Sequence, residues 1–290
     1  MTMQADRSTP AANGTWVERR PDPRQRSTVK QARRDTRLRI VLALLIPVGM
    51  LVSWELSARA GWIDARFFSQ PSAVADKAGE DIRSGLLWGE MQITIFRLLT
   101  GYLVGSVAGI LAGLMMSQIR LLRWLFEPII RALYVIPKLA LLPLFLLIFG
   151  LGEVPKLVFI SLGTFYIVAF TTLSAALMIP TAYHEVARSY GLSSGQRFRW
   201  MVLPAITPQI VASLKLASGT AMLLVIAVEF VNAHEGLGYY TWHAWQIFVP
   251  DRMYVGVVTV SIVGVVFSSL VGLLGSRLVR WADNEYGQTR

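Results

Sequence analysis

Few side chains in this chain could take part in chemistry, and two of them are isolated charges within apolar sequence. Lys138 directly follows Pro137 in one apolar stretch, and Glu229 stands near the end of another. An ionisable group inside a membrane span is costly unless it faces protein or water, so it marks a candidate functional site. We predict that Lys138 and Glu229 line a path for a transported solute. For Lys138 two alternatives stay open: its ammonium reaches an interface, or it binds carbonyls that nearby prolines leave without a donor.

The sequence contains no set of residues typical of an enzyme or a metal site. There is no cysteine, which excludes disulfides, thiol catalysis and cysteine-ligated metal. His234 and Glu235 do not have the spacing of a helical metal site, and His184 and His243 are far from them in sequence, so we expect no metal. No G-x-x-x-x-G-K-S/T phosphate loop occurs. We therefore expect that this chain binds no cofactor, is not an intramembrane enzyme and does not hydrolyse ATP by itself.

The composition is that of a membrane protein. The chain is 54% hydrophobic and only 16% charged, whereas soluble domains have roughly a quarter charged residues. Six mostly apolar runs are each long enough to cross a hydrocarbon core of about 30 Å. The runs are 40–60, 91–117, 124–149, 155–179, 205–228 and 254–276. We predict an all-α polytopic membrane protein with about six transmembrane helices.

The positive charge is concentrated at the amino terminus. Residues 1–39 hold ten Arg and Lys against four acids and almost no apolar side chains. We predict a disordered basic cytoplasmic tail over 1–39 that faces lipid rather than nucleic acid, because a membrane span follows it. The membrane domain then covers 40–281, and 282–290 form a carboxyl-terminal tail.

The distribution of Arg and Lys predicts the orientation. With the amino terminus inside, 18 of the 28 Arg and Lys fall on the cytoplasmic side. The positive-inside rule therefore favours both termini in the cytoplasm and an even number of crossings. The polar stretch over 181–204 then faces the cytoplasm as well.

Two spans carry features that predict their packing. The second has Gly101, Gly105, Gly109 and Gly113 at a spacing of four, which stacks them into one ridge for close packing against another helix. The third contains three prolines, so it should kink or break. Its prolines are Pro128, Pro137 and Pro143. In the same span Glu127 and Arg131 are four residues apart, and we expect them to form a structural ion pair.

The stretch over 181–204 has the local signals of two short helices joined by a sharp turn. Residues 183–190 are compatible with a helix, and Gly191 stands where a left-handed carboxyl cap is wanted. Ser193 and Gln196 have capping-box spacing for a second short helix. Leu203 and Pro204 close that segment, since proline suits the first turn of the next span.

The same stretch resembles a family signature. Glu185-Val186-Ala187, Gly191, Met201 and Leu203-Pro204 have the spacing of E-A-A-x3-G-x9-I-x-L-P, which is typical of the membrane subunits of binding-protein-dependent ABC importers. Val186 replaces alanine and Met201 replaces isoleucine, and both remain apolar. We call residues 181–204 the coupling loop, after the role that this resemblance implies.

Further landmarks narrow the resemblance to the nitrate, sulfonate and taurine permease family. They are Pro71-Ser72, Thr94 with Arg97 and Gly101, the run over 136–153, and Glu229 followed by Gly236-Leu237-Gly238. With the coupling loop, the similarity covers about residues 40–280.

The resemblance implies a type I ABC importer transmembrane domain in a prokaryotic inner membrane. Two permease subunits would pair around a path for a small anion such as a sulfonate, taurine or nitrate. Two cytoplasmic ATPases would use ATP and Mg²⁺, and an extracytoplasmic binding protein would deliver the cargo. Glu185 would contact the ATPase, while Ala187 and Gly191 would allow close approach and the turn. The alternative is an ion-coupled secondary transporter, with Glu229 and Lys138 as a proton-linked pair.

Overall fold

The computed structural model describes residues 41–43, 45–279 and 281, and this part of the chain is helical with connecting turns. It divides into two units, Met1–Ile63 and Asp64–Arg290, which are described separately. The predicted tails over 1–39 and 282–290 lie outside the described residues. In the first unit the helix Val41–Arg59 is long and apolar enough to cross a membrane, which agrees with the predicted span over 40–60.

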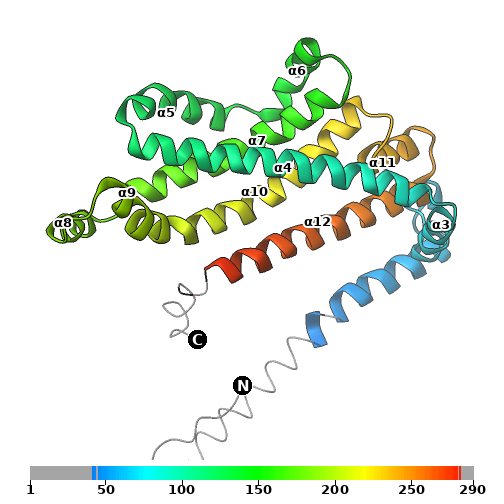
Figure 1. Ribbon diagram of the computed structural model, residues 1–290. Coiled ribbons are helices and arrows are strands. Elements are labelled where there is room, and N and C mark those ends of the chain that lie inside the picture. The colour runs from blue at the N-terminus through cyan, green and yellow to red at the C-terminus, as the bar shows by residue number, and fades with distance from the viewer. Residues whose placement is uncertain (1–40, 44, 280, 282–290) are drawn as a thin grey trace, which may run out of the picture. The chain divides into compact units, whose positions relative to one another are not determined.

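The second unit is a bundle of long helices with short helices at its ends (Figure 1). Its α-helices are α2 (Ala65–Phe68), α3 (Pro71–Arg83), α4 (Leu86–Gln118), α5 (Arg120–Val135), α6 (Leu142–Phe149), α7 (Glu153–Leu177), α8 (Thr181–Ser189), α9 (Ser194–Arg197), α10 (Leu203–Asn232), α11 (Leu237–Gln246) and α12 (Pro250–Leu278). Across the described residues, five helices qualify as spans, or six if one bent pair counts as a span. The prediction of about six transmembrane helices is confirmed, but α3 and α11 were not predicted.

The core forms where α4, α7 and α10 pack together. Leu98, Ile160, Val168 and Val225 are almost completely buried in it. The four ridge glycines of α4, Gly101, Gly105, Gly109 and Gly113, all lie against α7, where a Cβ on Gly101 would come within 2.6 Å of Ile160 and a Cβ on Gly113 within 2.7 Å of Thr172. The two backbones can therefore approach only because these positions carry no side chain.

The third span is broken, and one of its three prolines marks the place. The segments Arg120–Leu133 and Lys138–Phe149 are bent by 101° relative to each other, and the second begins with the 3₁₀ helix Lys138–Leu141 and continues as α6. Pro137 stands at the break, with Ile136 before it in an extended conformation (φ −64°, ψ 132°). The residue before a proline is disfavoured in the helical region, which ends α5 there. Pro128 lies inside α5 and Pro143 in the first turn of α6, so neither breaks the span.

The fifth span begins earlier than predicted. Helix α9, a π-helical segment over Phe198–Val202, and α10 form one continuous helix, Ser194–Asn232, of 39 residues. The prediction that Leu203 and Pro204 close a separate short helix is therefore wrong. Proline has no N–H and its ring crowds the preceding turn, and the wider π turn just before Pro204 accommodates both effects without ending the helix.

Candidate functional site

The turn of the coupling loop is closed by backbone hydrogen bonds around Gly191. The Leu192 N–H donates to the Ala187 carbonyl at 3.0 Å, and the Gly191 N–H donates to the Arg188 carbonyl at 2.9 Å. Gly191 has φ +65°, a left-handed conformation that costs a residue with a Cβ about 1–2 kcal/mol. This pair of bonds is the Schellman motif, and it ends α8 at the predicted residue.

The predicted capping box starts α9. The Gln196 N–H donates to Ser193 Oγ at 3.3 Å, and the Ser193 N–H donates to Gln196 Oε1 at 2.9 Å. Each side chain thus binds a backbone N–H that has no partner within the helix. The end of α8 and the start of α9 are both capped within three residues, so the turn between them is well defined.

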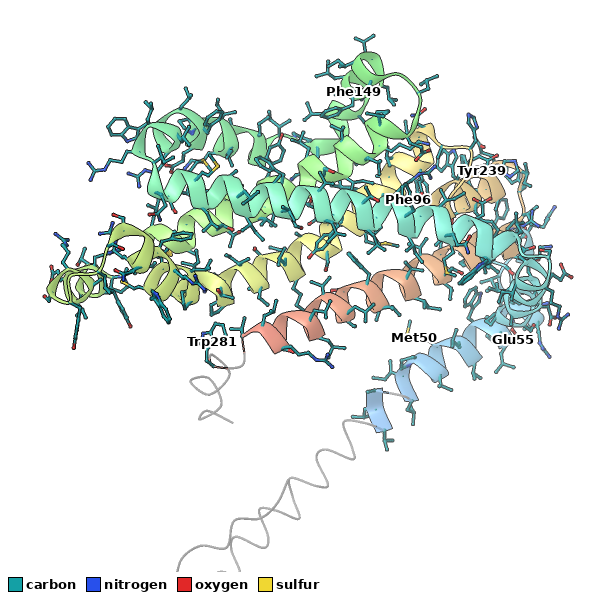
Figure 2. All side chains as sticks on the ribbon, viewed as in Figure 1. Met50, Glu55, Phe96, Phe149, Tyr239 and Trp281 are labelled. Atoms are coloured by element: carbon teal, nitrogen blue, oxygen red, sulfur yellow. The ribbon has the colours of Figure 1, made fainter. Side chains whose placement is uncertain are left out.

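The signature residues of the coupling loop divide into an exposed set and a packed set. Glu185 and Gly191 are exposed and Val186 is 55% exposed, whereas Ala187 is only 4% exposed. Met201 packs against the buried cluster of Val202, Ile206 and Ile210 at the base of α10. Leu203 is half-buried and Pro204 is exposed. Figure 2 shows the side chains of α8 at the end of the second unit opposite Tyr239.

A charge cluster lies toward the other end of the bundle, with the buried Arg97 at its centre and the Glu153 side chain, 49% exposed, at its edge. Arg97 is 1% exposed. Its Nε and Nη2 both donate to the carboxylate of Glu153 at 2.7 Å, and its Nη1 donates to Glu229 Oε1 at 2.8 Å and to the Glu235 carbonyl at 2.7 Å. Lys156 adds an ion pair to Glu153 at 2.7 Å. Two cations and two carboxylates thus join α4, α7, α10 and the segment that precedes α11.

The carboxylate of Glu229 is fully engaged. Glu229 is 0% exposed and also accepts hydrogen bonds from Thr94 Oγ1 at 3.0 Å and from the Gly238 N–H at 2.8 Å. A Cβ on Gly236 would come within 2.8 Å of Arg97 Nη1, and one on Gly238 would come within 2.6 Å of Glu229 Cβ. Several sequence landmarks therefore meet at one place: Thr94, Arg97, Glu229 and Gly236-Leu237-Gly238. The two glycines allow the backbone at the start of α11 to lie against the charged groups.

Comparisons with known proteins decide the family. Residues 105–284 match the family described as binding-protein-dependent transport system inner membrane component. The chain belongs to this family. It is thus the permease subunit of an ABC importer, a multi-pass inner-membrane protein, and family membership rules out the secondary-transporter alternative. Permeases of this family work with an ATPase, which is a separate subunit, and with a substrate-binding protein.

Curated relatives cover most of the permease. It is 28% identical to a putative aliphatic sulfonates transport permease protein, SsuC, of Bacillus subtilis over 99% of this chain and 100% of that protein. It is 30% identical to the protein of the same name in Escherichia coli, over 75% of this chain and 83% of that one. The taurine transport system permease protein TauC of Escherichia coli is 27% identical over 80% and 86% of the two chains.

Solved structures share the fold. A chain of the MetNI methionine ABC transporter, in an inward-facing conformation, gives a TM-score of 0.51 at 24% identity and covers 64% of the permease and 91% of itself. A chain of an amino acid ABC transporter gives a TM-score of 0.56 at 18% identity. The match covers 70% of the permease and 96% of that chain. These similarities place the bundle in the fold of type I importer transmembrane domains, as predicted.

The two residues predicted to line a path are in different settings. Glu229 is completely buried and paired with Arg97, and its path-lining role stays a prediction. Lys138 is half-buried in the 3₁₀ turn at the break of the third span, and its side chain runs past Gly163 of α7. Its path-lining role stays a prediction. The expected pair of Glu127 and Arg131 is present on α5 at 2.6 Å.

A second buried acid holds α11 in place. Asp81 of α3 accepts a hydrogen bond from the Tyr240 hydroxyl at 2.6 Å and two from Arg252 at 3.1 and 3.2 Å. Burial raises the pKa of Asp81, but the hydrogen bonds from Arg252 and Tyr240 outweigh it and hold the pKa below its ordinary value. Asp81 therefore stays charged and links α3, α11 and α12.

Sequence reasoning used Arg97 only as a landmark of the family resemblance and missed its central role. Helix α4 begins at Leu86, five residues before the predicted span, so Arg97 lies well inside it. The same rule that singled out Lys138 would have singled out Arg97, since a cation within an apolar span needs a partner. In the part of the chain that the structure describes, no group of acids and histidines could hold a metal ion.

Proposed function

We propose that this permease forms the translocation path for a small organic anion, an aliphatic sulfonate or taurine, delivered by its binding protein. The names of the SsuC and TauC relatives support this cargo class. Nitrate, the other anion that the sequence resemblance implies, has no counterpart in those names. The transported molecule undergoes no chemical change, and the work comes from ATP and Mg²⁺ bound by the ATPase.

The coupling loop is the surface on which the ATPase docks. The observation that carries this proposal is its geometry: a capped helix and turn with Glu185 and Val186 exposed and with Tyr190 80% exposed. Because the loop continues through the π segment directly into α10, a movement of the loop is passed to a long transmembrane helix. A docking surface can drive transport only if ATP-dependent closure of the ATPases favours one arrangement of the bundle over another.

The assembly that follows is two copies of this permease above two ATPases. In this arrangement both termini and the coupling loop face the cytoplasm, and the binding protein docks on the opposite side. The segment over 1–39 contributes positive charge on the cytoplasmic side, which agrees with the positive-inside rule.

The test is a pair of substitutions in the coupling loop. In proteoliposomes with the cognate ATPase and binding protein, Glu185→Lys and Gly191→Asp should abolish taurine or ethanesulfonate uptake while membrane insertion stays normal. Glu80→Lys is the matched control, since Glu80 is an exposed helical glutamate of α3 that pairs with Lys77 at 2.8 Å. Normal uptake by both loop variants would refute the docking role. ATP hydrolysis by the purified permease alone would refute the assignment of hydrolysis to a separate ATPase subunit.

A further inference from the structure

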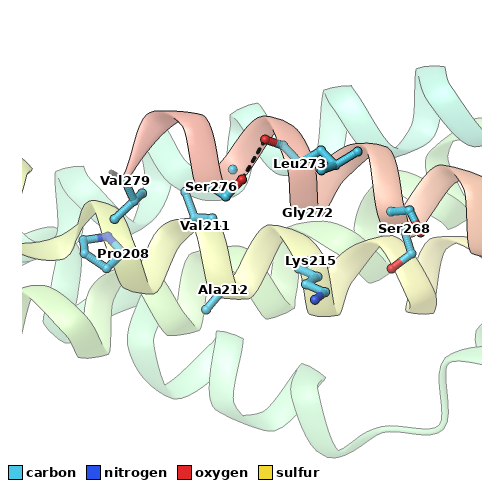
Figure 3. A pocket seen from close by; sticks show the side chains of 11 residues that line it. Pro208, Val211, Ala212, Lys215, Ser268, Gly272, Leu273, Ser276 and Val279 are labelled. Atoms are coloured by element: carbon cyan, nitrogen blue, oxygen red, sulfur yellow. Dashed lines mark hydrogen bonds between the residues drawn. The ribbon is translucent and has the colours of Figure 1, made fainter. Parts of the chain in front are cut away.

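A groove with a cation and several hydroxyls in an otherwise mostly apolar lining lies between two of the long helices. Helices α10 and α12 line an open cavity of about 640 Å³. Figure 3 shows Lys215 on α10, opposite Gly272, with Ser268 of α12 nearby. Ser269 and Ser276 also line the cavity. A cation and three hydroxyls are unusual on a surface that apolar lipid would cover, so this face needs another explanation.

Lys215 is a deep and exposed cation. It lies about 18 Å from Leu203 along α10, at about 1.5 Å per residue. Its stem packs over Gly272, where a Cβ would lie 3.7 Å from Lys215 Cε. Within the described part of the chain its ammonium has no ion pair or hydrogen bond. The acid of the same helix, Glu229, is about 21 Å further along and is bound by Arg97.

The groove continues toward the coupling loop. A second cavity of about 710 Å³ shares Pro208 with the first and is lined by Thr171, Ser174 and Gln209, and it reaches Tyr183 of α8. Ala205, which lines the second cavity, and Ala212, which lines the first, are small, exposed residues of α10. The two adjoining cavities thus carry polar side chains at Gln209 near the loop and at Lys215 deeper along α10.

We propose that Lys215, with the hydroxyls of Ser268 and Ser269, forms a transient binding site for the transported anion within the permease. The Ser276 hydroxyl already donates to the Leu273 carbonyl at 3.0 Å, so Ser268 and Ser269 are the available donors. One ammonium and two O–H groups suit the three oxygens of a sulfonate. A single charge binds the anion without trapping it, because no second cation lines this cavity. This assignment rests on the proposed transport function and names Lys215 as the residue that binds the anion inside the permease.

The absence of cysteine permits a direct chemical test that does not depend on knowing the cargo. In membranes holding the complete transporter, Ser269→Cys is treated with 2-sulfonatoethyl methanethiosulfonate, an anion, and with its trimethylammonium counterpart. We expect the anionic reagent to react about tenfold faster when Lys215 is present than in Lys215→Met, and the cationic reagent to show no such gain. Leu216→Cys, on the adjacent exposed position of α10, is the lipid-facing control and should stay unlabelled.

Three results would overturn the assignment. If neither reagent labels Ser269→Cys, lipid or protein covers the face. If both reagents label it at rates independent of Lys215, the groove holds water but does not select anions. If the cysteine instead forms a disulfide between two chains, the face is a contact between permease copies.

Uptake measurements then link the site to transport. In proteoliposomes with the binding protein and ATPase, Lys215→Met should lower the initial rate of taurine or ethanesulfonate uptake about tenfold, and Lys215→Arg should restore most of it. Uptake by Lys138→Met is measured alongside, because Lys138 is the cation that the sequence predicted to line the path. Unchanged uptake in Lys215→Met would refute the assignment. Failure of the wild-type permease to import either sulfonate would refute the proposed cargo class, whereas the labelling result for Lys215 would stand.

Discussion

The coupling loop and the charge cluster around Arg97 are stabilised in opposite ways. In the loop, the hydrogen bonds around the turn join residues no more than five positions apart, and they belong to caps on an exposed surface. In the cluster, the bonds from Arg97 reach residues 56, 132 and 138 positions away, and the arginine is buried. One region has a local fold of its own, and the other exists only when the bundle is assembled.

This difference separates two functions within one chain. A loop with a self-contained conformation can be pushed by a partner without changing shape, so the force passes to α10. A cluster that joins α4, α7, α10 and the segment before α11 instead fixes how those helices are placed. Substitutions in the cluster should therefore affect the stability of the permease, and substitutions in the loop should affect its coupling to the ATPase.

The largest effect is expected from Arg97→Met. This change leaves the buried carboxylate of Glu229 without its cation, which costs about 3–5 kcal/mol for a broken buried pair. The melting temperature of the detergent-purified permease should fall sharply. The double variant Arg97→Met with Glu229→Leu should recover part of the loss, because it removes both buried charges. Equal melting of Arg97→Met and the wild type would contradict the stabilising role of the cluster.

A second prediction concerns the contact between α4 and α7. In Gly105→Ala the new methyl group would overlap the Thr164 hydroxyl and the Ser161 carbonyl, whereas Gly89 of the same helix has open space around it. Overpacking of this kind costs about 1–3 kcal/mol. Gly105→Ala should therefore lower the melting temperature, and Gly89→Ala should leave it unchanged or raise it slightly through helix propensity. Similar behaviour of the two variants would show that the ridge does not set the helix separation.

The same contrast explains what could be predicted from sequence. The Gly191 cap and the Ser193 capping box depend on neighbours in the chain, and their spacing alone was sufficient. The apolar runs predicted the spans because a hydrocarbon core imposes length and composition on each helix separately. The π segment before Pro204 has no such signature, so the continuity of α9 with α10 was missed.

The partners of Arg97 and Asp81 could not be predicted because they depend on how the helices pack. Arg97 and Glu153 are 56 residues apart, and Asp81 and Arg252 are 171 apart. No single-sequence pattern connects such positions. For Glu229 the sequence correctly indicated that the carboxylate avoids lipid, but a path and a buried partner satisfy that requirement equally well. The structure adds the buried partners of this carboxylate, Arg97, Thr94 and Gly238.

At the loop, Gly191→Ala should affect coupling more than stability. Alanine at φ +65° costs about 1–2 kcal/mol and disfavours the Schellman turn. We expect fewer taurine molecules imported per ATP hydrolysed, with the melting temperature of the bundle nearly unchanged. Gly195→Ala is the matched control, because Gly195 lies in a helix and has open space around it. Gly191→Asn should be milder than alanine, since asparagine tolerates the left-handed region. A large fall in bundle stability with Gly191→Ala would show that the loop is not independent of the helices.

The smallest effect is expected from Ser193→Ala, which removes the Oγ acceptor for the Gln196 N–H. Loss of an amino-terminal cap typically costs about 1 kcal/mol. Here water can replace the lost bond, because Ser193 and Gln196 are exposed. The start of α9 should therefore fray without loss of the helix that continues into α10, and Ser193→Thr should restore the cap. Faster hydrogen exchange confined to residues near 193–197, together with slightly less uptake per ATP, would support a loop whose shape is set by its own caps. Faster exchange that spreads to the buried residues around Arg97 would instead show that the two regions are structurally coupled.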